Sequence, residues 1–381
     1  MPDPGHVAVG AWSGGRYLRF GEAIDEERLA ALLRPDGRIA TVLTADVYGQ
    51  GEADRVAGRA VAGLGRDDYC LVGAVGHDFV DGQRDGARGF PRFTDPALRG
   101  PDGYAGYVRA ATEGSLERIG VDAFDVLLLH NPDRLGYTHP AVWEALDAVR
   151  AAGLTRALGV APGPANGFTL DLIDCLERFG AQIDWAMIIL NPLEPWPGGL
   201  VLEAARRHGV RLITRVVDYG GLFWDELRPE HQLPPGDHRS FRPAGWVADG
   251  LARMEPMRAI AARHGLTPLQ LACQWNLAHE GVACAVPTLI QEAFPGARPI
   301  ESQREELAAT PAELALGSDE VDAIRAAGDN TGCMALKGAS PDHAGDDRPD
   351  RWALQPHHAD LAARWGIDPA ADLTQRSPQA A

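Results

Sequence analysis

Two side chains that can exchange protons, Tyr48 and His130, each follow a short apolar run. A tyrosine hydroxyl and an imidazole can act together as general acid and base on a carbonyl or hydroxyl compound. Arg215 ends a third apolar run, and its fixed positive charge suits a carboxylate, a phosphate or a developing enolate oxygen. We therefore expect Tyr48 and His130 to be catalytic and Arg215 to bind substrate.

Further polar or aromatic side chains occupy comparable places after apolar runs. Residues at such places also commonly cap strands or contact solvent in loops, so their type alone assigns them no chemistry. We expect the following side chains to bind substrate together with Arg215: Trp12, Asp46, His77, Asn191 and Asp218.

The elements that position these residues alternate between strand-like and helix-like segments. Continuously apolar runs such as VLLLH and MIIL are typical of parallel strands buried on both faces. The alternation favours a (β/α)8 barrel, whose active residues come from the carboxyl ends of its strands. An open doubly wound sheet is the alternative, but VAVGAWSGG is a poor match to the GxGxxG expected after its first strand. The expected strands cover residues 7–12, 39–44, 70–75, 124–130, 157–160, 185–190, 210–214 and 283–287.

Composition limits the partners and the compartment. The 381 residues contain 36 Lys and Arg against 53 Asp and Glu, a net charge of -17, which argues against nucleic acid or an anionic membrane as partner. The five scattered cysteines and the absence of a visible signal peptide indicate a reduced, cytoplasmic protein. No His or Cys stands at metal-ligand spacing, so we expect no metal. We expect a small-molecule substrate, and the sequence indicates no particular oligomeric state.

Three segments together resemble the aldo-keto reductase family. They are TADVYGQGEADRVAGRAV (44–61), DVLLLHNPD (125–133) and GLTPLQLACQWNLAH (265–279), supported by VAVGAW (7–12) and ALGVAPG (157–163). The resemblance implies an aldo-keto-reductase-type barrel over residues 1–330. Residues 331–381 then form a C-terminal extension that is a candidate lid over the barrel mouth.

The resemblance implies a catalytic tetrad of Asp, Tyr, Lys and His, in which a cation near the tyrosine lowers its pKa. Tyr48 and His130 match the tyrosine and the histidine. Leu43 stands at the place of the aspartate, and Ala74 at the place of the lysine. The chain has a single lysine, Lys337, which is therefore the one lysine that a C-terminal loop could bring back to the mouth.

The positions that the resemblance assigns to a nicotinamide also depart from the family pattern. Ala161 and Pro162 replace a Ser-Asn pair, Met187 replaces a glutamine, and Arg215 replaces a stacking aromatic residue. The adenine-binding Glu-Asn pair reads Glu305-Glu306. Each lost hydrogen bond costs on the order of 1 kcal/mol. NADP(H) is therefore a doubtful cofactor.

Three functions remain open from the sequence. The favoured one is a redox-neutral reaction, such as dehydration, elimination or isomerisation of a sugar-like or keto compound, with Tyr48 and His130 as acid and base. The alternative is an NADP(H)-dependent aldo-keto reductase, and the third is a non-catalytic ligand-binding barrel. Whether the protein binds NADPH separates the first two.

Overall fold

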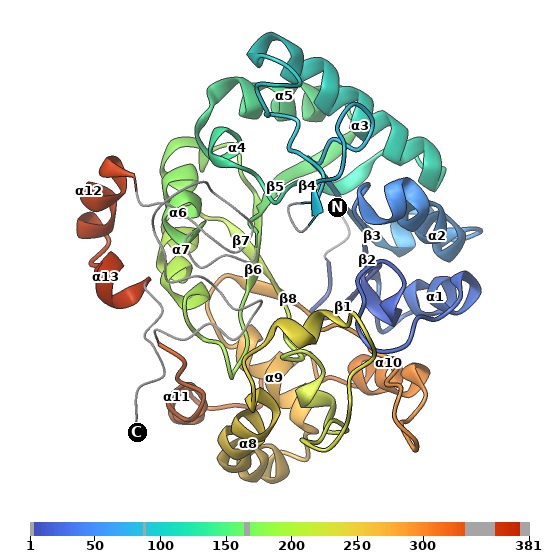
Figure 1. Ribbon diagram of the computed structural model, residues 1–381, viewed down its shortest axis with the longest axis vertical. Helices are drawn as coiled ribbons and strands as arrows, with labels where there is room; N and C mark the ends of the chain where they lie inside the picture. The colour runs from blue at the N-terminus through green and yellow to red at the C-terminus, as the bar shows by residue number, and fades with distance from the viewer. Residues whose placement is uncertain (1–3, 87–88, 164–167, 332–354, 374–381) are drawn as a thin grey trace.

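The computed structural model describes residues 4–86, 89–163, 168–331 and 355–373. Within these ranges, eight parallel strands follow one another in chain order around a barrel (Figure 1). A bridge between Val7 and Ala285 joins the last strand to the start of the first. The (β/α)8 barrel expected from the alternating pattern is confirmed. The strands are β1 (Ala8–Gly10), β2 (Thr41–Leu43), β3 (Cys70–Val75), β4 (Phe124–His130), β5 (Thr155–Ala161), β6 (Trp185–Ile189), β7 (Arg211–Arg215) and β8 (Val282–Val286).

Helices surround the ring of strands and connect most of them (Figure 1). They are α1 (Glu26–Leu33), α2 (Glu52–Val61), α3 (Tyr104–Ile119), α4 (Arg134–Thr138), α5 (Pro140–Ala151), α6 (Phe168–Phe179), α7 (Leu202–Arg207), α8 (Trp246–Arg263), α9 (Pro268–Leu277), α10 (Ile300–Ala308), α11 (Ser318–Ala327), α12 (Pro356–Arg364) and α13 (Pro369–Asp372). Local signals explain several helix ends. Asp25 caps α1 by accepting a hydrogen bond from the Arg28 backbone, and Thr267 forms a capping box with Gln270 at α9. Gly120 ends α3 in the left-handed conformation that glycine adopts without strain.

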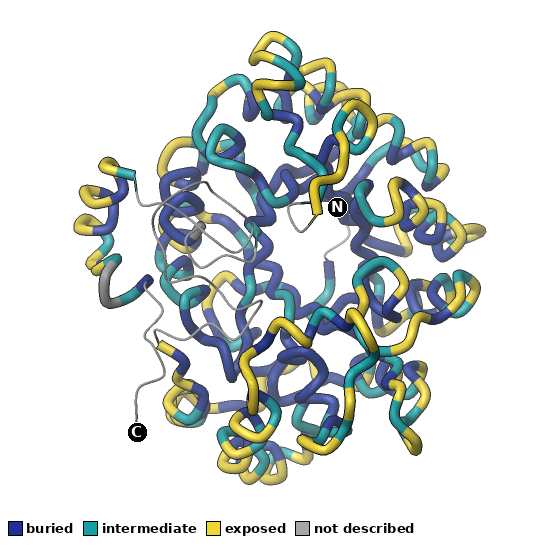
Figure 2. Tube along the Cα trace, viewed as in Figure 1, coloured by how far each residue is buried: buried dark blue, intermediate teal, exposed yellow. Residues whose placement is uncertain are grey.

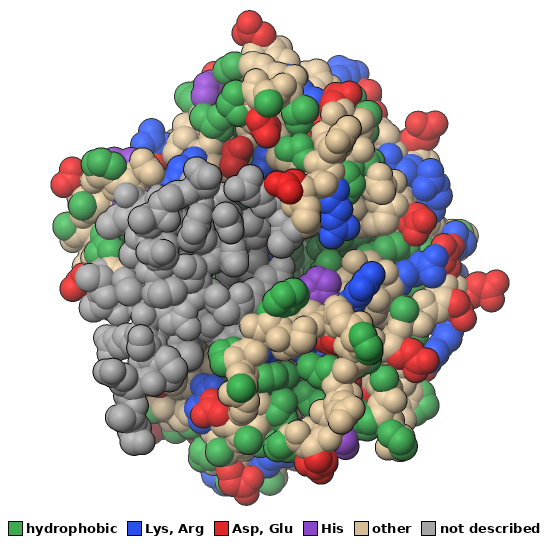
Figure 3. All heavy atoms as spheres, in the orientation of Figure 1, with side chains coloured by type: hydrophobic (Ala, Val, Ile, Leu, Met, Phe, Trp, Pro, Cys, Tyr) green, Lys and Arg blue, Asp and Glu red, His purple; other side chains and the backbone are tan. Residues whose placement is uncertain are grey.

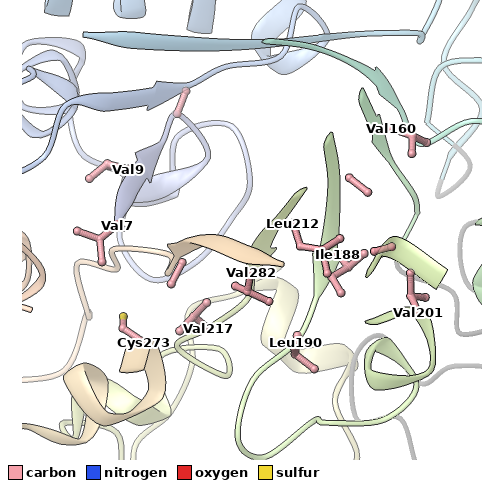
Figure 4. Packing of buried hydrophobic residues seen from close by; sticks show 14 of the residues in the cluster. Val7, Val9, Val160, Ile188, Leu190, Val201, Leu212, Val217, Cys273 and Val282 are labelled. Atoms are coloured by element: carbon pink, nitrogen blue, oxygen red, sulfur yellow. The ribbon is translucent and has the colours of Figure 1, made fainter. Parts of the chain in front are cut away.

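Two layers of buried apolar side chains hold the barrel together. Alternate strand residues, such as Val72 and Leu128, point into the barrel interior and form one cluster there. The residues between them point outward and pack beneath the helices. Figure 4 shows part of this outer layer, with Val9 and Leu212 on strands and Cys273 on α9. In Figure 2 the strands are buried along their length, while the helices expose their outer sides. Both faces of each strand are therefore covered, one by the barrel interior and the other by the helices.

The long connection between β7 and α8, residues 216–245, is held in place by a buried arginine. Arg239 forms ion pairs with Asp237 at 2.8 Å and with Glu292 at 2.6 Å. Asp237 also accepts a hydrogen bond of 2.8 Å from the backbone of Gly21. These contacts tie the connection to the segments that follow β1 and β8, so three parts of the chain form one wall beside the barrel.

The C-terminal helices α12 and α13 lie on the outer side of the barrel, beside α6 (Figure 1). His358 approaches Asp171 at 3.2 Å, and Arg364 pairs with Glu177 at 2.6 Å. These two helices therefore pack against α6, and residues 332–354 and 374–381 lie outside the described part of the chain, so a lid formed by the extension stays a prediction. Lys337 lies outside the described residues. Among the helices that are described, none is both long and apolar enough to cross a bilayer.

Candidate active site

Strand alternation carries His130 and Arg215 to the mouth of the barrel. His130 ends β4 two residues after the inward-facing Leu128, and Arg215 ends β7 two residues after the inward-facing Ile213. Tyr48 begins the short 3₁₀ turn Tyr48–Gly51 after β2. Its ring lies edge-on to that of His130, with 5.7 Å between the ring centroids. The structure therefore brings together the two residues that we expected to be catalytic.

The two residues of this pair have opposite pKa changes with a common cause. Burial raises the pKa of the Tyr48 hydroxyl to about 12, and the Arg215 charge opposes this increase. Burial, reinforced by the charges of Arg92 and Arg215, lowers the pKa of His130 to about 3. At neutral pH the tyrosine is therefore protonated and the imidazole is neutral. A protonated tyrosine can donate a proton, and a neutral histidine can form a hydrogen bond to an uncharged oxygen.

The Arg215 side chain extends from the end of β7 to the segment that follows β5. One of its guanidinium nitrogens donates a hydrogen bond of 2.9 Å to the carbonyl of Pro162, just after β5. Its buried Nε has no hydrogen-bond partner within the described residues. Burial lowers the pKa of Arg215, but an arginine remains charged in a protein at neutral pH. A cation thus faces Tyr48 even though the chain has alanine at the position expected for a lysine.

A histidine and an arginine from the β3–α3 connection complete the cluster. The His77 ring lies 4.9 Å from that of His130, and the Arg92 guanidinium contacts His77 Nδ1 at 3.0 Å. Asn131 approaches His77 Nε2 at 3.4 Å. Burial, and then the charge of Arg92, lower the pKa of His77 well below its ordinary value. The sequence predicted His77 but not Arg92, because the long β3–α3 connection has no repeating hydrophobic pattern from which the position of Arg92 could be predicted.

The backbone is strained beside each of the three central side chains. Asn131 directly follows His130 with a φ of 44°, and Val216 directly follows Arg215 with a φ of 60°. Gln50, two residues after Tyr48, has a φ of 52°. Left-handed conformations are costly for residues other than glycine, above all for β-branched valine, and they concentrate at functional sites. The strain supports the assignment of this end of the barrel as the site.

Apolar side chains occupy most of the remaining inner wall. Leu43 and Ala74, at the places of the expected aspartate and lysine, belong to the interior cluster, as do Ala161 and Met187. Trp12 also belongs to this cluster and is 7% exposed. Its ring therefore contributes apolar wall rather than a free polar group.

Two expected substrate ligands have their polar groups occupied by the chain itself. The carboxylate of Asp218 accepts hydrogen bonds from the backbone of Thr288 at 2.7 Å and of Gly221 at 2.8 Å. The side-chain oxygen of Asn191 accepts from two backbone amides in its own loop, and its amide donates to the Val216 carbonyl at 3.1 Å. Both residues hold mouth loops in place, so the expectation that they bind substrate finds no support in the geometry.

Asp46 faces away from the cluster. Its backbone continues the pairing of β2 with β3 by bonding to the Ala74 carbonyl at 3.1 Å. Because Leu43 and Ala45 point inward, Thr44 and Asp46 point outward, and Thr44 indeed bonds to Asp54 of α2. Asp46 lines a separate cavity beside α3, so its expected role beside Tyr48 is not supported.

The positions expected to bind adenine are used in ion pairs. Glu305 pairs with Arg38 at 2.8 Å, and Glu306 pairs with Arg298 at 2.6 Å.

Near the mouth, two guanidinium nitrogens of the buried Arg242 have no hydrogen-bond partner in the described part of the chain, although Glu194 approaches to 3.7 Å. In the described ranges no group of three or more His, Cys, Asp or Glu side chains could hold a metal ion. Acidic and basic side chains are scattered over the coloured part of the face in Figure 3.

Comparison with known proteins agrees with this architecture. The chain matches the model of the Aldo/keto reductase family over residues 7–325. A methylglyoxal reductase of Escherichia coli (strain K12) is 25% identical over 285 residues, which cover 74% of this chain and 82% of that protein. The structure of a glycerol dehydrogenase from Gluconobacter oxydans has a TM-score of 0.64 at 22% identity and covers 84% of this chain and 90% of its own.

An aldo/keto reductase from Klebsiella pneumoniae, solved in complex with NADP and acetate, has a TM-score of 0.56 at 20% identity. The alignment covers 87% of this chain and 94% of the Klebsiella chain. Solved structures at this level of identity establish the fold, whereas the family model spans most of the sequence. The chain belongs to the aldo/keto reductase family.

Proposed function

We propose that this protein is an NADP(H)-dependent oxidoreductase that reduces the carbonyl group of a small substrate. The observation that carries the proposal is that Arg215 ends β7 at the same mouth as Tyr48 and His130, where its charge acts on both of them. Arg215 supplies the positive charge near the tyrosine that Ala74, at the position expected for a lysine, does not provide. Membership of the family and the similarity to a methylglyoxal reductase favour this reductase over the redox-neutral reaction expected first.

The buried donors at the mouth fit such a cofactor. Within the described residues, Arg215 Nε and two nitrogens of Arg242 are buried donors without hydrogen-bond partners, and His130 Nδ1, which donates or accepts according to its tautomer, also has none. Unpartnered buried donors are costly, so they are best explained by a ligand rich in acceptor atoms. A dinucleotide phosphate provides such atoms, and Arg242 is the residue that would hold them, while Arg215 acts at the nicotinamide end of the site. The apolar Ala161 and Met187 would lie against the uncharged parts of the ligand.

Each residue of the cluster then has a distinct task. Reduced nicotinamide, when bound, supplies the hydride that reaches the carbonyl carbon. Tyr48 transfers its hydroxyl proton to the carbonyl oxygen, which yields the alcohol and leaves a tyrosinate. Arg215 stabilises the tyrosinate by its charge until solvent returns the proton. Neutral His130 orients the carbonyl by a hydrogen bond, and His77, held by Arg92, keeps the His130 ring in place.

Turnover with a defined carbonyl compound tests the proposal. Methylglyoxal and NADPH are mixed with the protein, and oxidation of NADPH is followed together with formation of the reduced product. We expect one NADPH to be consumed for each carbonyl reduced, and Tyr48→Phe to remove the activity without removing NADPH binding. If the protein binds no NADPH at any accessible concentration, the proposal is wrong.

A redox-neutral acid–base reaction remains the second candidate, because apolar residues stand at four positions expected to serve the tetrad or the nicotinamide: Leu43, Ala74, Ala161 and Met187. Tyr48 and His130 would then exchange protons with a hydroxyl or keto compound. Conversion of such a compound without added nucleotide and without change in oxidation state would favour this candidate over the reductase.

A further inference from the structure

A cavity of about 380 Å³ lies outside the barrel, against one side of α3. Its walls come from α3, from the segment after β2 and from the start of the β3–α3 connection. The residues that matter for its chemistry are Asp46, Val80, Gly106, Ala110, Ala111 and Arg118. Tyr48, His130 and Arg215 are not among the residues that line it, so this cavity is separate from the proposed active site.

The polar feature of the cavity is the carboxylate of Asp46. This residue is 1% exposed, and its Oδ1 has no hydrogen-bond partner among the described residues. Burial, followed by repulsion from Asp54, raises the pKa of Asp46 well above its ordinary value. Leaving a buried acceptor unsatisfied costs on the order of 1–3 kcal/mol, and more if the group is charged.

The neighbouring carboxylates already have partners. Asp54 accepts hydrogen bonds from Arg118 at 2.9 and 3.1 Å, and from Ser115 at 2.8 Å. Asp78 and Asp81 both pair with Arg99, the latter at 3.0 Å. The two arginines are therefore engaged by the other three carboxylates, and Asp46 is left as the carboxylate without a matching charge.

Charged and titratable groups from each surrounding element face Asp46. Helix α2 contributes Asp54, and helix α3 contributes Arg118 together with Tyr107, whose own pKa is raised by burial and then by Asp46. The β3–α3 connection contributes Asp78. Carboxylates thus outnumber arginines around the cavity, and the local electrostatics favour a positively charged ligand.

The other walls are small and apolar. Gly106, Ala110 and Ala111 leave a shallow channel along α3, and Val80, which is 78% exposed, lies at its edge. Gly106 and Ala110 are exposed, and a methyl group added at Gly106 would meet no atom within 4 Å, so the cavity opens to solvent on this side. Such walls suit a compact hydrocarbon group, because burying its surface is favourable without polar partners.

We propose that this cavity is a second binding site, which takes a small organic cation. A protonated amine of the ligand donates a hydrogen bond to Asp46 Oδ1, and its hydrocarbon part lies along Gly106, Ala110 and Ala111. The inference is independent of the proposed reductase activity, because none of the three central mouth residues lines the cavity.

Benzylamine is a suitable probe, and benzyl alcohol is its uncharged counterpart. Binding to the full chain is measured by isothermal titration calorimetry. We expect saturable binding of benzylamine and at least about tenfold weaker binding of benzyl alcohol, which corresponds to about 1.4 kcal/mol. Because binding favours the ionised form of Asp46, benzylamine should bind more tightly as the pH rises through the raised pKa of this carboxyl.

Three variants locate the binding. Asp46→Asn should weaken benzylamine binding about tenfold or more while the apolar walls remain. Gly106→Leu should fill the channel and abolish binding, whereas the matched Gly106→Ala should retain it, since the added methyl group meets nothing. Thermal unfolding of each variant shows that it is folded. Absence of saturable benzylamine binding to the unchanged chain would overturn the proposal, as would equal binding to Asp46→Asn or to Gly106→Leu.

Discussion

Replacing Arg215 with methionine removes the positive charge beside Tyr48 while keeping a side chain of similar length. The Tyr48 pKa of about 12 already lies two units above the ordinary value of 10.0. This difference makes the tyrosinate about 3 kcal/mol harder to form than in water. Arg215 is the group whose charge opposes this cost, so its loss raises the pKa further.

The expected kinetic effect follows from the charge that develops during proton transfer. Removing one preorganised group that stabilises a developing anion costs about a hundred- to a thousandfold in kcat. We therefore expect Arg215→Met to lose about a hundredfold in kcat for carbonyl reduction at saturating NADPH. Arg215→Lys keeps the cation and should remain within about tenfold of the unchanged protein.

The pH dependence of alcohol oxidation gives a second, independent sign of the same interaction. In this direction Tyr48 must be ionised, so the rate should rise by about tenfold per pH unit below its pKa of about 12. Arg215→Met should shift the whole profile toward higher pH. The reasoning is refuted if Arg215→Met keeps its kcat and pH profile and shows only a higher KM for NADPH.

Three further predictions concern Tyr48 and His130 in the site and Arg239 in the connection after β7. Tyr48→Phe should lower kcat by about a hundred- to ten-thousandfold, because the proton donor is lost, while an NADPH binding isotherm stays unchanged. His130 is neutral above its pKa of about 3, whereas in the unfolded chain it takes up a proton near its ordinary 6.5, so stability should fall as the pH drops from about 6.5 toward about 3. In urea unfolding between these pH values, His130→Asn should lose less free energy of unfolding than the unchanged protein does. Arg239→Met leaves Asp237 and Glu292 buried without their cation and should cost about 3–5 kcal/mol in urea unfolding, and an unchanged midpoint would contradict this.

The barrel was predictable from the sequence because parallel strands buried on both faces leave continuous apolar runs. The runs at 70–75 and 124–130 coincide with β3 and β4, and the others overlap their strands. The placement of Tyr48 and His130 at one end followed from the same pattern, since the carboxyl ends of parallel strands meet at one mouth.

The sequence did not reveal which way individual side chains face or what they bond to. Asp46 stands only two residues before Tyr48, yet alternation after β2 turns it outward toward α3. Asp218 follows β7 as expected, but the backbone of Thr288, far along the chain, occupies its carboxylate. Arg92 reaches His77 from a connection without periodicity. Each of these outcomes depends on contacts between distant segments, which spacing along the chain does not encode.

Arg215 shows how a position can lose one role and acquire another. Judged by its place in the sequence, it replaces an aromatic residue and counts against a nicotinamide. In the folded chain its guanidinium reaches Pro162 and its charge acts on both Tyr48 and His130. The positive charge that Ala74 on β3 cannot provide therefore comes from Arg215 on β7. Only the folded structure reveals this, because the two residues are far apart in the sequence.

The fate of the hydride tests the central claim most directly. NADPH that carries deuterium at the transferred position is incubated with the protein and methylglyoxal, and the product is analysed by mass spectrometry. Direct hydride transfer predicts one deuterium on the carbon that was the carbonyl carbon, and Tyr48→Phe should form this labelled product about a hundred- to ten-thousandfold more slowly. A product formed at the normal rate without deuterium would contradict the assignment of this protein as an NADP(H)-dependent reductase.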